Sequence, residues 1–516
     1  MTAARGVTLS ATIGSPALSV VETAFTGSPP PVARIRTKQA PDAPWQTRLA
    51  EGLPDEFDYF AEIEGRLPRT LAGTLYRNGP GLFERAGFRK RTILDGDGMI
   101  RATTFADGRA RFRNRFVRTA KYDAEEKAGT FLYPTWTTPA PTNRSCIPNH
   151  SQAGVMAVVK AGVLYAFDEI GSPWALDAPS LETTQQLDPF EGEPGTGPTN
   201  YKAHSKTDGT SGEWVLVGQG GRKNSELHVL VKDRAGRQIR HVVHSNPCRS
   251  AYFHDFFWAA PYVVFHLHPA LLSPLTMFAG LHSFADCLAW KPERGSLLLV
   301  VDTTGKRPPV TLEVPASWMW HSLNAYVFGD TIVADFVGYD APDHFLGPEA
   351  AFRAIMHSRL GRATSPGTVR RLTIDLRSRR ARLETIAQGR YEFPVVPQSR
   401  SGHRHRYGYV ASQGADEGWF HDGLARLDTD TGESAAFHFG EGHYVGEPVF
   451  IPDPDWPTDE AIGEDHGFLV AEVLDGRRGI SFLALFDAEH VPDGPFAKVH
   501  LRHHLPFSCH GWWETA

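Results

Sequence analysis

The sequence predicts a large all-β protein, with an architecture such as a β-propeller. From about residue 70 onward, short runs of β-branched and aromatic residues recur between turns rich in Gly, Pro, Asp and Asn. These runs do not alternate with helical segments, which argues against a sheet built from βαβ units. The 49 glycines give the chain many places to turn a corner. Because no strict repeat is visible, regular blades of the WD type are not predicted.

Individual strands can be assigned from their residues. Residues 108–117 alternate in the period-2 manner of a strand with one wet face, and residues 154–168 indicate a hairpin. Similar signals predict strands at 214–217, 262–267, 297–301, 331–337, 369–374, 468–473 and 481–486. Helix is scarce. The clearest candidate is 348–360, with Pro348 near its first turn and Gly361 after its last.

Composition bounds the class of protein. With 53 basic and 59 acidic residues and no long basic run, a nucleic-acid partner is not expected. The four cysteines form no C-x-x-C pair, and their sparseness fits a reducing cytoplasm. No stretch reaches the roughly 18 uninterrupted apolar residues of a membrane-spanning helix. We expect residues 1–50 to be a loosely ordered N-terminal tail and 51–516 to be a single catalytic domain.

Common catalytic signatures are missing from the sequence. There is no P-loop, no G-x-S-x-G elbow, no H-E-x-x-H and no G-x-G-x-x-G between a strand and a helix. The segment Asp95-Gly-Asp97-Gly resembles the start of a calcium loop, but Met99 and Ile100 stand where an acid and a glycine are needed. We therefore interpret this segment as a turn.

Four of the 23 histidines share one setting. Each flanks a strand and has aromatic or small neighbours: His204, His254, His321 and His510. For any one of them, a core histidine bonded to backbone is the simpler interpretation. Their spacing excludes a local metal loop, but strands that converge on one axis would each present one imidazole. The four together predict a four-histidine metal centre.

Three carboxylates lie in comparably apolar stretches, namely Glu169, Glu392 and Glu447. A buried carboxylate needs a partner, because an unpaired one costs several kcal/mol or becomes protonated. One candidate partner is the second ring N–H of a metal-bound histidine, which the carboxylate would hold in one tautomer. The other is a salt bridge with Arg or Lys, and the sequence leaves both open.

From about Phe57 to the C-terminus, the chain resembles the carotenoid cleavage oxygenases, non-haem iron enzymes that split alkene bonds. The resemblance rests on Leu75-Tyr-Arg-Asn-Gly-Pro80, on Leu94-Asp-Gly-Asp-Gly-Met99, on the W-H-x-x-N-A-Y pattern around His321 and on the closing His510-Gly. It implies a seven-bladed β-propeller with a helical and loop dome over the metal face. It further implies that the four histidines hold Fe(2+) and that the three glutamates orient three of them.

The resemblance also bears on the substrate. Relatives that cleave phenolic stilbenes have a lysine immediately before the first of these glutamates, where this chain has Asp168. We therefore expect cleavage of a carotenoid or apocarotenoid with O2. Cleavage of stilbene- or isoeugenol-type alkenes, a non-catalytic retinoid- or carotenoid-binding propeller, and a propeller hydrolase with another metal are the alternatives. Substrate contacts are expected from Phe83, Tyr133 and Asp168.

The apolar stretch 269–280 lies in the region where relatives carry a membrane-dipping patch. It indicates either a peripheral membrane contact of a cytoplasmic protein or a loop packed over the propeller. The sequence leaves the oligomeric state open.

Overall fold

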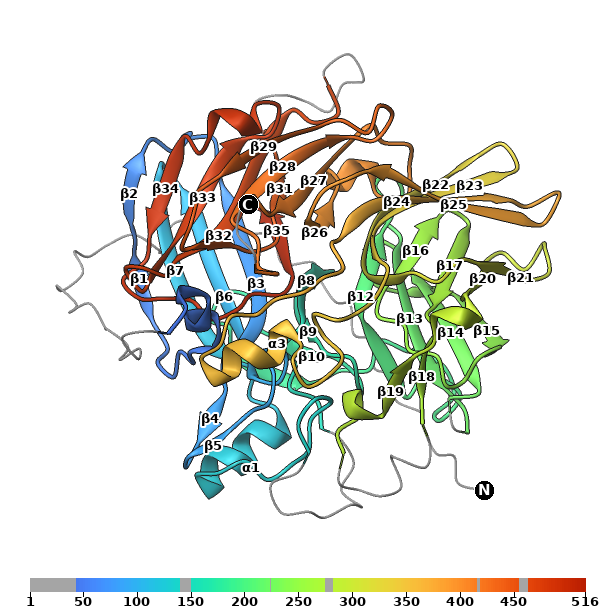
Figure 1. Ribbon diagram of the computed structural model, residues 1–516, viewed down its shortest axis with the longest axis horizontal. Helices are drawn as coiled ribbons and strands as arrows, with labels where there is room; N and C mark the ends of the chain where they lie inside the picture. The colour runs from blue at the N-terminus through green and yellow to red at the C-terminus, as the bar shows by residue number, and fades with distance from the viewer. Residues whose placement is uncertain (1–42, 140–149, 223, 274–281, 415–417, 454–462) are drawn as a thin grey trace, which may run out of the picture. The chain divides into compact units, whose positions relative to one another are not determined.

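The computed structural model describes residues 43–516 except 140–149, 223, 274–281, 415–417 and 454–462. Seven antiparallel sheets of four or more strands form the blades of a β-propeller, as the sequence resemblance implies (Figure 1). In each blade the strands run from an inner strand near the axis to an outer edge strand. The blades therefore bring seven inner strands, distant in sequence, close to one another.

The first three blades, with strands named from the inside outward, come mostly from the N-terminal half. Blade one contains β35 (Gly511–Thr515), β3 (Gly73–Leu82), β6 (Asp97–Ala106), β7 (Arg109–Phe116) and β1 (Asp58–Phe60). Blade two contains β8 (Met156–Lys160), β9 (Val163–Phe167), β10 (Trp174–Leu176) and β11 (Thr183–Gln186). Blade three contains β12 (Asn200–Thr207), β13 (Trp214–Gly220), β14 (Glu226–Lys232) and β15 (Gln238–Ser245).

The remaining four blades follow in chain order. Blade four contains β16 (Phe256–Ala259), β17 (Tyr262–Leu267), β20 (Ser296–Asp302) and β21 (Val310–Val314). Blade five contains β22 (Trp318–Phe328), β23 (Thr331–Tyr339), β24 (Thr368–Asp375) and β25 (Arg380–Ala387). Blade six contains β26 (Tyr391–Val395), β27 (Tyr407–Ser412), β28 (Gly423–Asp428) and β29 (Ser434–His438). Blade seven contains β30 (His443–Val445), β31 (Val449–Pro452), β32 (Gly467–Asp475), β33 (Ile480–Asp487), β34 (Ala497–His500) and β2 (Glu62–Gly65).

Both ends of the described chain close the ring of blades. The C-terminal strand β35 pairs with β3, so the last residues complete the first blade. The early strand β2 pairs with β34, so residues near the N-terminus complete the last blade. Backbone hydrogen bonds therefore attach a strand from each end of the described chain to a blade that is otherwise built from other parts of the sequence.

The hydrophobic core lies between neighbouring blades. Val217 and Val229 of blade three pack against Phe265 and Leu299 of blade four, and all four side chains are buried. Outer strands such as β15 alternate between half-buried and exposed positions instead. The predicted strands are confirmed, because alternation and turn residues report this local geometry directly.

Short elements outside the blades form a dome. They include α1 (Ala120–Ala128), α3 (Ala351–Ala354), η1 (Trp45–Ala50), η2 (Ala285–Cys287), η3 (Pro292–Arg294), η4 (Ile355–His357), and the ribbons β4 (Glu84–Arg85) with β5 (Phe88–Arg89) and β18 (Ala270–Leu272) with β19 (Leu288–Trp290). Two further 3-10 turns are η5 (Gln398–Arg400) and η6 (Val491–Asp493).

The predicted helix at 348–360 is too long. The structure has one α-helical turn, α3, which continues into the 3-10 turn η4 and ends at Ser358 in the left-handed conformation (φ 57°). A left-handed non-glycine residue stops the helix before Gly361 can act as its C-terminal cap.

Two sequence expectations concern the surface. The apolar stretch 269–280 includes β18, but residues 274–281 lie outside the described part of the chain, so the membrane contact stays a prediction. Within the described residues, no helix has the length and apolar character needed to cross a membrane.

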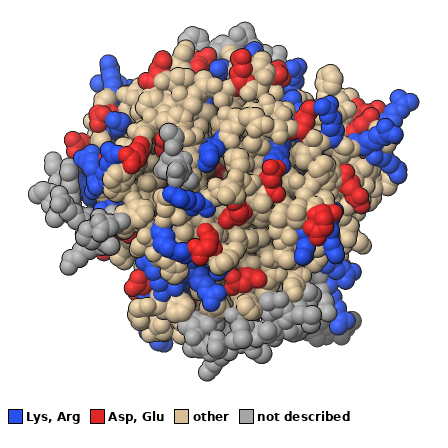
Figure 2. All heavy atoms as spheres, in the orientation of Figure 1, with Lys and Arg blue, Asp and Glu red and all other residues tan. Residues whose placement is uncertain are grey.

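On the face shown in Figure 2, acidic and basic side chains are interspersed among uncharged surface. Residues 1–42, most of the predicted tail, also lie outside the described residues.

Candidate metal centre

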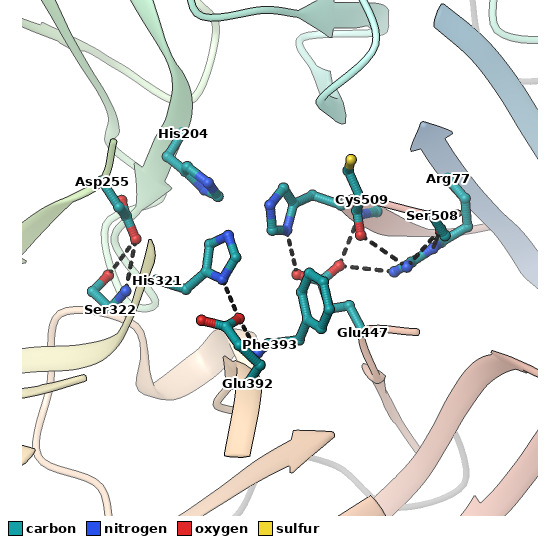
Figure 3. Close-up of polar contacts among 12 residues, drawn as sticks. Arg77, His204, Asp255, His321, Ser322, Glu392, Phe393, Glu447, Ser508 and Cys509 are labelled. Carbon is teal, nitrogen blue, oxygen red and sulfur yellow. Dashed lines mark hydrogen bonds and ion pairs between the residues drawn. The ribbon is translucent and has the colours of Figure 1, made fainter. Parts of the chain in front are cut away.

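Four blades each contribute one histidine to a single cluster on the axis. His204 lies in β12 and His321 in β22, while His254 and His510 come just before β16 and β35. All four are buried, and their possible ligand nitrogens lie within 4.8 Å of one another. The Nε2 atoms of His204 and His254 are 3.0 Å apart. The structure thus brings together the four histidines that the sequence singled out. Figure 3 shows two of them, His204 and His321, next to each other.

Irregularities in the inner strands accompany these residues. The pairing of β12 with β13 shifts register between Tyr201 and Ser205, beside His204. The pairing of β22 with β23 shifts between Met319 and Ser322, beside His321. A β-bulge locally bends a strand and redirects its side chains, and bulges are common next to functional sites. The register shifts in β12 and β22 explain how two inner strands direct an imidazole toward the propeller axis.

Burial lowers the pKa of two imidazoles of this cluster, those of His204 and His510. Desolvation lowers the pKa of His204 well below 6.5, and neighbouring His510 and His254 lower it further. Burial likewise lowers the pKa of His510 to about 4, although Glu447 opposes the shift. Neutral imidazole is the form that binds a metal ion. The donor set therefore fits a transition metal that favours nitrogen ligands.

Three carboxylates contact the far nitrogens of three of these histidines. Glu169 Oε1 lies 2.7 Å from His254 Nδ1, Glu392 Oε2 lies 2.5 Å from His321 Nδ1, and Glu447 Oε1 lies 2.7 Å from His510 Nδ1. An Nδ1–H that donates to a carboxylate leaves Nε2 with its lone pair free for the metal. The contacts support the orienting role proposed for the glutamates.

The three carboxylates differ in what else they contact. Glu169 also accepts a hydrogen bond from Lys202 Nζ at 3.0 Å, and Glu447 accepts one from Arg77 Nη1 at 2.8 Å. The salt-bridge alternative from the sequence is thus also true for these two. Among the described residues, Glu392 has no lysine or arginine within ion-pair distance; its other partners are the Phe393 amide and the Tyr339 hydroxyl. Glu392 therefore presents an uncompensated negative charge behind His321.

An apolar cavity of about 480 Å³ opens beside the histidines. Three of the histidines, His254, His321 and His510, form part of its wall. The other lining side chains are mostly aromatic or aliphatic: Leu94, Trp136, Val155, Trp320, Phe352, Glu392, Phe393, Trp419, Phe507 and Cys509. Leu94, Trp136 and Phe352 belong to the dome, so the dome covers the metal face. A cavity that is mostly apolar with polar groups at one point suits an apolar ligand.

The substrate residues expected from the sequence do not line this cavity. The Asp168 carboxylate accepts hydrogen bonds from the amides of Gln152 (2.6 Å) and Glu169 (2.7 Å) and so closes a turn. Phe83 is buried in the hydrophobic core of the dome, and the Tyr133 ring lies 4.2 Å from that of His150. A substrate contact by these residues stays a prediction.

Several site residues were missed by the sequence reasoning. Phe393 follows Glu392 directly, has a φ of +53°, and stacks on His321 with ring centroids 5.3 Å apart. Positive φ is rare for a bulky residue and costs about 1–3 kcal/mol, so the surrounding structure must hold the ring there. In the sequence, the one signal for Phe393 was its position directly after the predicted site residue Glu392.

Asp255 was also missed, although it follows His254. Its carboxylate accepts hydrogen bonds from the amide and hydroxyl of Ser322, each at 2.8 Å (Figure 3). It also accepts one from Lys206 Nζ at 2.8 Å. Ser322 is adjacent to His321. Asp255 therefore links its own segment, which carries His254, to β12 and β22, which carry His204 and His321.

Comparison with known proteins agrees with this geometry. The apocarotenoid-15,15'-oxygenase of Synechocystis is 28% identical over 480 residues, which cover 90% of this chain and 94% of the relative. An isoeugenol monooxygenase of Pseudomonas nitroreducens is 27% identical, covering 89% of this chain and 95% of that protein. A crystal structure of cobalt-substituted Synechocystis apocarotenoid oxygenase superposes with a TM-score of 0.83 at 26% identity, covering 92% of this chain and 98% of that one.

The sequence model of one family spans nearly the whole chain. It matches residues 51–515 and is described as retinal pigment epithelial membrane protein. The match includes all four histidines, the three glutamates and every blade of the propeller. The chain therefore belongs to the retinal pigment epithelial membrane protein family, which includes the carotenoid oxygenases.

Proposed function

We propose that this protein is an iron(II)-dependent dioxygenase that cleaves a C=C bond of a carotenoid or apocarotenoid to give two carbonyl products. The observation that carries the proposal is the position of the four-histidine cluster at one side of a buried, largely aromatic cavity. A metal centre that opens on an apolar chamber suits a reaction of O2 with an apolar alkene.

The donor set supports iron as the metal. The ion would be held by His204, His254, His321 and His510, and imidazole nitrogen is a ligand that suits iron. When bound, iron(II) supplies the redox chemistry by which O2 reacts with an alkene. The relative with a cobalt-substituted crystal structure is described as an apocarotenoid oxygenase, which supports metal binding by this fold.

The protein's own residues would position and shield the reactants. Glu169, Glu392 and Glu447 fix three imidazoles in orientation and offset the charge of the ion. Trp320, Phe352 and Phe507 hold the alkene against the histidines and exclude water from the cavity. No acid or base on the protein is required for scission.

Cleavage of an aromatic alkene is the second candidate. Isoeugenol monooxygenases from two Pseudomonas species are 27% and 28% identical to the chain, about as similar as the apocarotenoid oxygenase. The aromatic side chains of the same wall would also pack against the ring of a phenylpropanoid. Asp168, in place of the lysine of phenolic stilbene cleavers, argues against that branch.

An aerobic assay tests the proposal. Iron-loaded protein is incubated with a carotenoid, an apocarotenal, isoeugenol and a stilbene, and the products are identified by mass spectrometry. We expect carbonyl fragments from the carotenoid or apocarotenal. Turnover of the aromatic alkenes alone would establish the second candidate. Bound pigment without O2 consumption would establish a binding protein instead, and zinc or calcium in the purified protein would favour a hydrolase.

A further inference from the structure

Among the described residues, one tryptophan of the cavity wall has an indole N–H without a hydrogen-bond partner. Trp136 lines the cavity, is 5% exposed, and its buried Nε1 atom has no hydrogen-bond acceptor among the described residues. The other two indoles of the wall are engaged: Trp320 Nε1 donates to His344 Nε2 at 2.5 Å, and Trp419 interacts with the Tyr339 hydroxyl. Trp136 is thus the tryptophan of this wall with a free donor.

A buried N–H without an acceptor is costly. A donor that loses its water on burial and gains no acceptor keeps the full cost of desolvation. Natural proteins leave few buried polar groups unpaired, and the exceptions call for a water, a ligand or another functional explanation. Because the wall around Trp136 is largely aromatic, an acceptor brought by the substrate fits this donor.

The structure holds Trp136 firmly in place. Its carbonyl oxygen accepts a hydrogen bond from the Ala285 amide at 2.8 Å. The next residue, Thr137, donates its amide to Asp95 Oδ1 at 3.2 Å, and the hydroxyls of Thr137 and Thr138 both donate to Asp95 Oδ2. Asp95 is fully buried. The Asp95-Gly-Asp97-Gly segment, interpreted from sequence as a turn, therefore anchors the loop that presents this indole.

The position of Trp136 relative to the metal ligands limits what the substrate can be. Its ring centroid lies 6.5 Å from that of Trp320, and Trp320 in turn lies 4.9 Å from His254. One aromatic ring therefore separates the indole from a predicted metal ligand. A substrate oxygen hydrogen-bonded to Trp136 would be separated by several covalent bonds of the substrate from a C=C bond held beside the histidines.

We propose that the Trp136 indole N–H binds an acceptor oxygen of the substrate, so that the enzyme selects oxygen-bearing alkenes over pure hydrocarbons. The acceptor is a hydroxyl, ether or carbonyl oxygen at a distance from the cleaved bond. The inference rests on the proposed function, because it names the class of alkene that the same cavity takes. Trp136 acts as a specificity residue. Its ring packs against that of Phe345, with the two ring centroids 5.4 Å apart.

The test compares wild type with Trp136→Phe, which keeps an aromatic ring and removes the donor. Binding to the metal-loaded protein is measured under nitrogen by equilibrium dialysis. The probes are two matched pairs: an apocarotenal with its oxygen-free hydrocarbon, and 4-hydroxystilbene with stilbene. We expect wild type to bind the oxygenated member of at least one pair about 10-fold more tightly. Trp136→Phe should lose that preference through weaker binding of the oxygenated member alone.

The matched control is Trp290→Phe, because Trp290 is half-buried and absent from the cavity wall. It should keep the wild-type preference, and metal content and melting temperature should be equal in all three proteins. Equal preference in wild type and Trp136→Phe, or no preference in wild type, would overturn the inference. These outcomes are separate from failure of the proposed function, which would appear as retained preference without cleavage in air.

Discussion

Glu392 lies 2.5 Å from His321 Nδ1 and, within the described residues, has no Lys or Arg beside it, whereas Glu447 bridges His510 and Arg77. Two carboxylates with the same apparent role therefore sit in different charge environments. Glu392 adds a full negative charge behind the metal ligands, while the charge of Glu447 is shared with a buried guanidinium. Substitution of Glu392 should therefore affect metal affinity alone, whereas substitution of Glu447 should affect both metal affinity and stability.

Glu392→Gln should weaken metal affinity about 10- to 100-fold, because it replaces the charged carboxylate that faces His321 Nδ1 by a neutral amide. The metal-free variant should be at least as stable as wild type, since no buried cation loses its partner. Metal affinity can be measured by competition with a chelator, and stability by thermal unfolding of the metal-free protein. A large drop in melting temperature would contradict this assignment of charge.

Glu447→Gln should weaken metal affinity to a similar degree but also destabilise the metal-free fold. Arg77 is 1% exposed and would lose its carboxylate partner at 2.8 Å, which costs about 3 kcal/mol for a buried ion pair. The same two measurements apply. Identical stability of the Glu392 and Glu447 variants would show that the Arg77 contact has no energetic role.

His321→Ala should abolish metal binding and alkene cleavage together, because one of four neutral ligands is lost. Metal content per chain after dialysis is the direct measurement. His490→Ala is the control, since His490 is exposed and contacts Asp487 far from the cluster. Wild-type metal content in the His321 variant would disprove the four-histidine site.

Phe393→Gly should widen the range of substrates. A second cavity of about 420 Å³ shares Phe393, Trp419 and Phe507 with the metal cavity, so removing this ring would join the two. Glycine also accepts the φ of +53° without strain. The kcat/KM ratio of a full-length carotenoid to an apocarotenal should rise about 10-fold. Phe420→Ala, which enlarges the second cavity alone, should leave that ratio unchanged.

His503 should make the fold sensitive to mild acid. Burial lowers its pKa from 6.5 to about 4, so the unfolded chain binds a proton more readily than the folded one between these values. The contribution of neutral His503 to the free energy of unfolding is therefore complete above pH 6.5. It falls as the pH drops towards 4, by about 3 kcal/mol at most. His503→Gln should flatten the pH dependence of the melting temperature between pH 6.5 and 4. An unchanged slope would rule out His503 as the source.

Local sequence patterns were sufficient for the strands and the candidate ligands. Alternating side chains in β7 and the hairpin β8–β9 reflect backbone geometry that each segment imposes by itself. The four histidines stood out because each lies among aromatic or small residues beside a strand, a setting unusual for a polar ring. Even so, the blade count and the glutamate roles came from resemblance to a family and not from these patterns.

What the sequence by itself determined is therefore the class of fold and the chemical groups of the metal centre. The tertiary structure decided their environment: which carboxylate has a cation, which strand bulges, and which aromatic rings enclose the cavity. Arg77 and Glu447 are separated by 370 residues, and Trp136 reaches the cavity from a dome loop anchored by Asp95. Such contacts depend on the closure of the blades into a ring, and no local period in the chain encodes which distant partners that closure brings together.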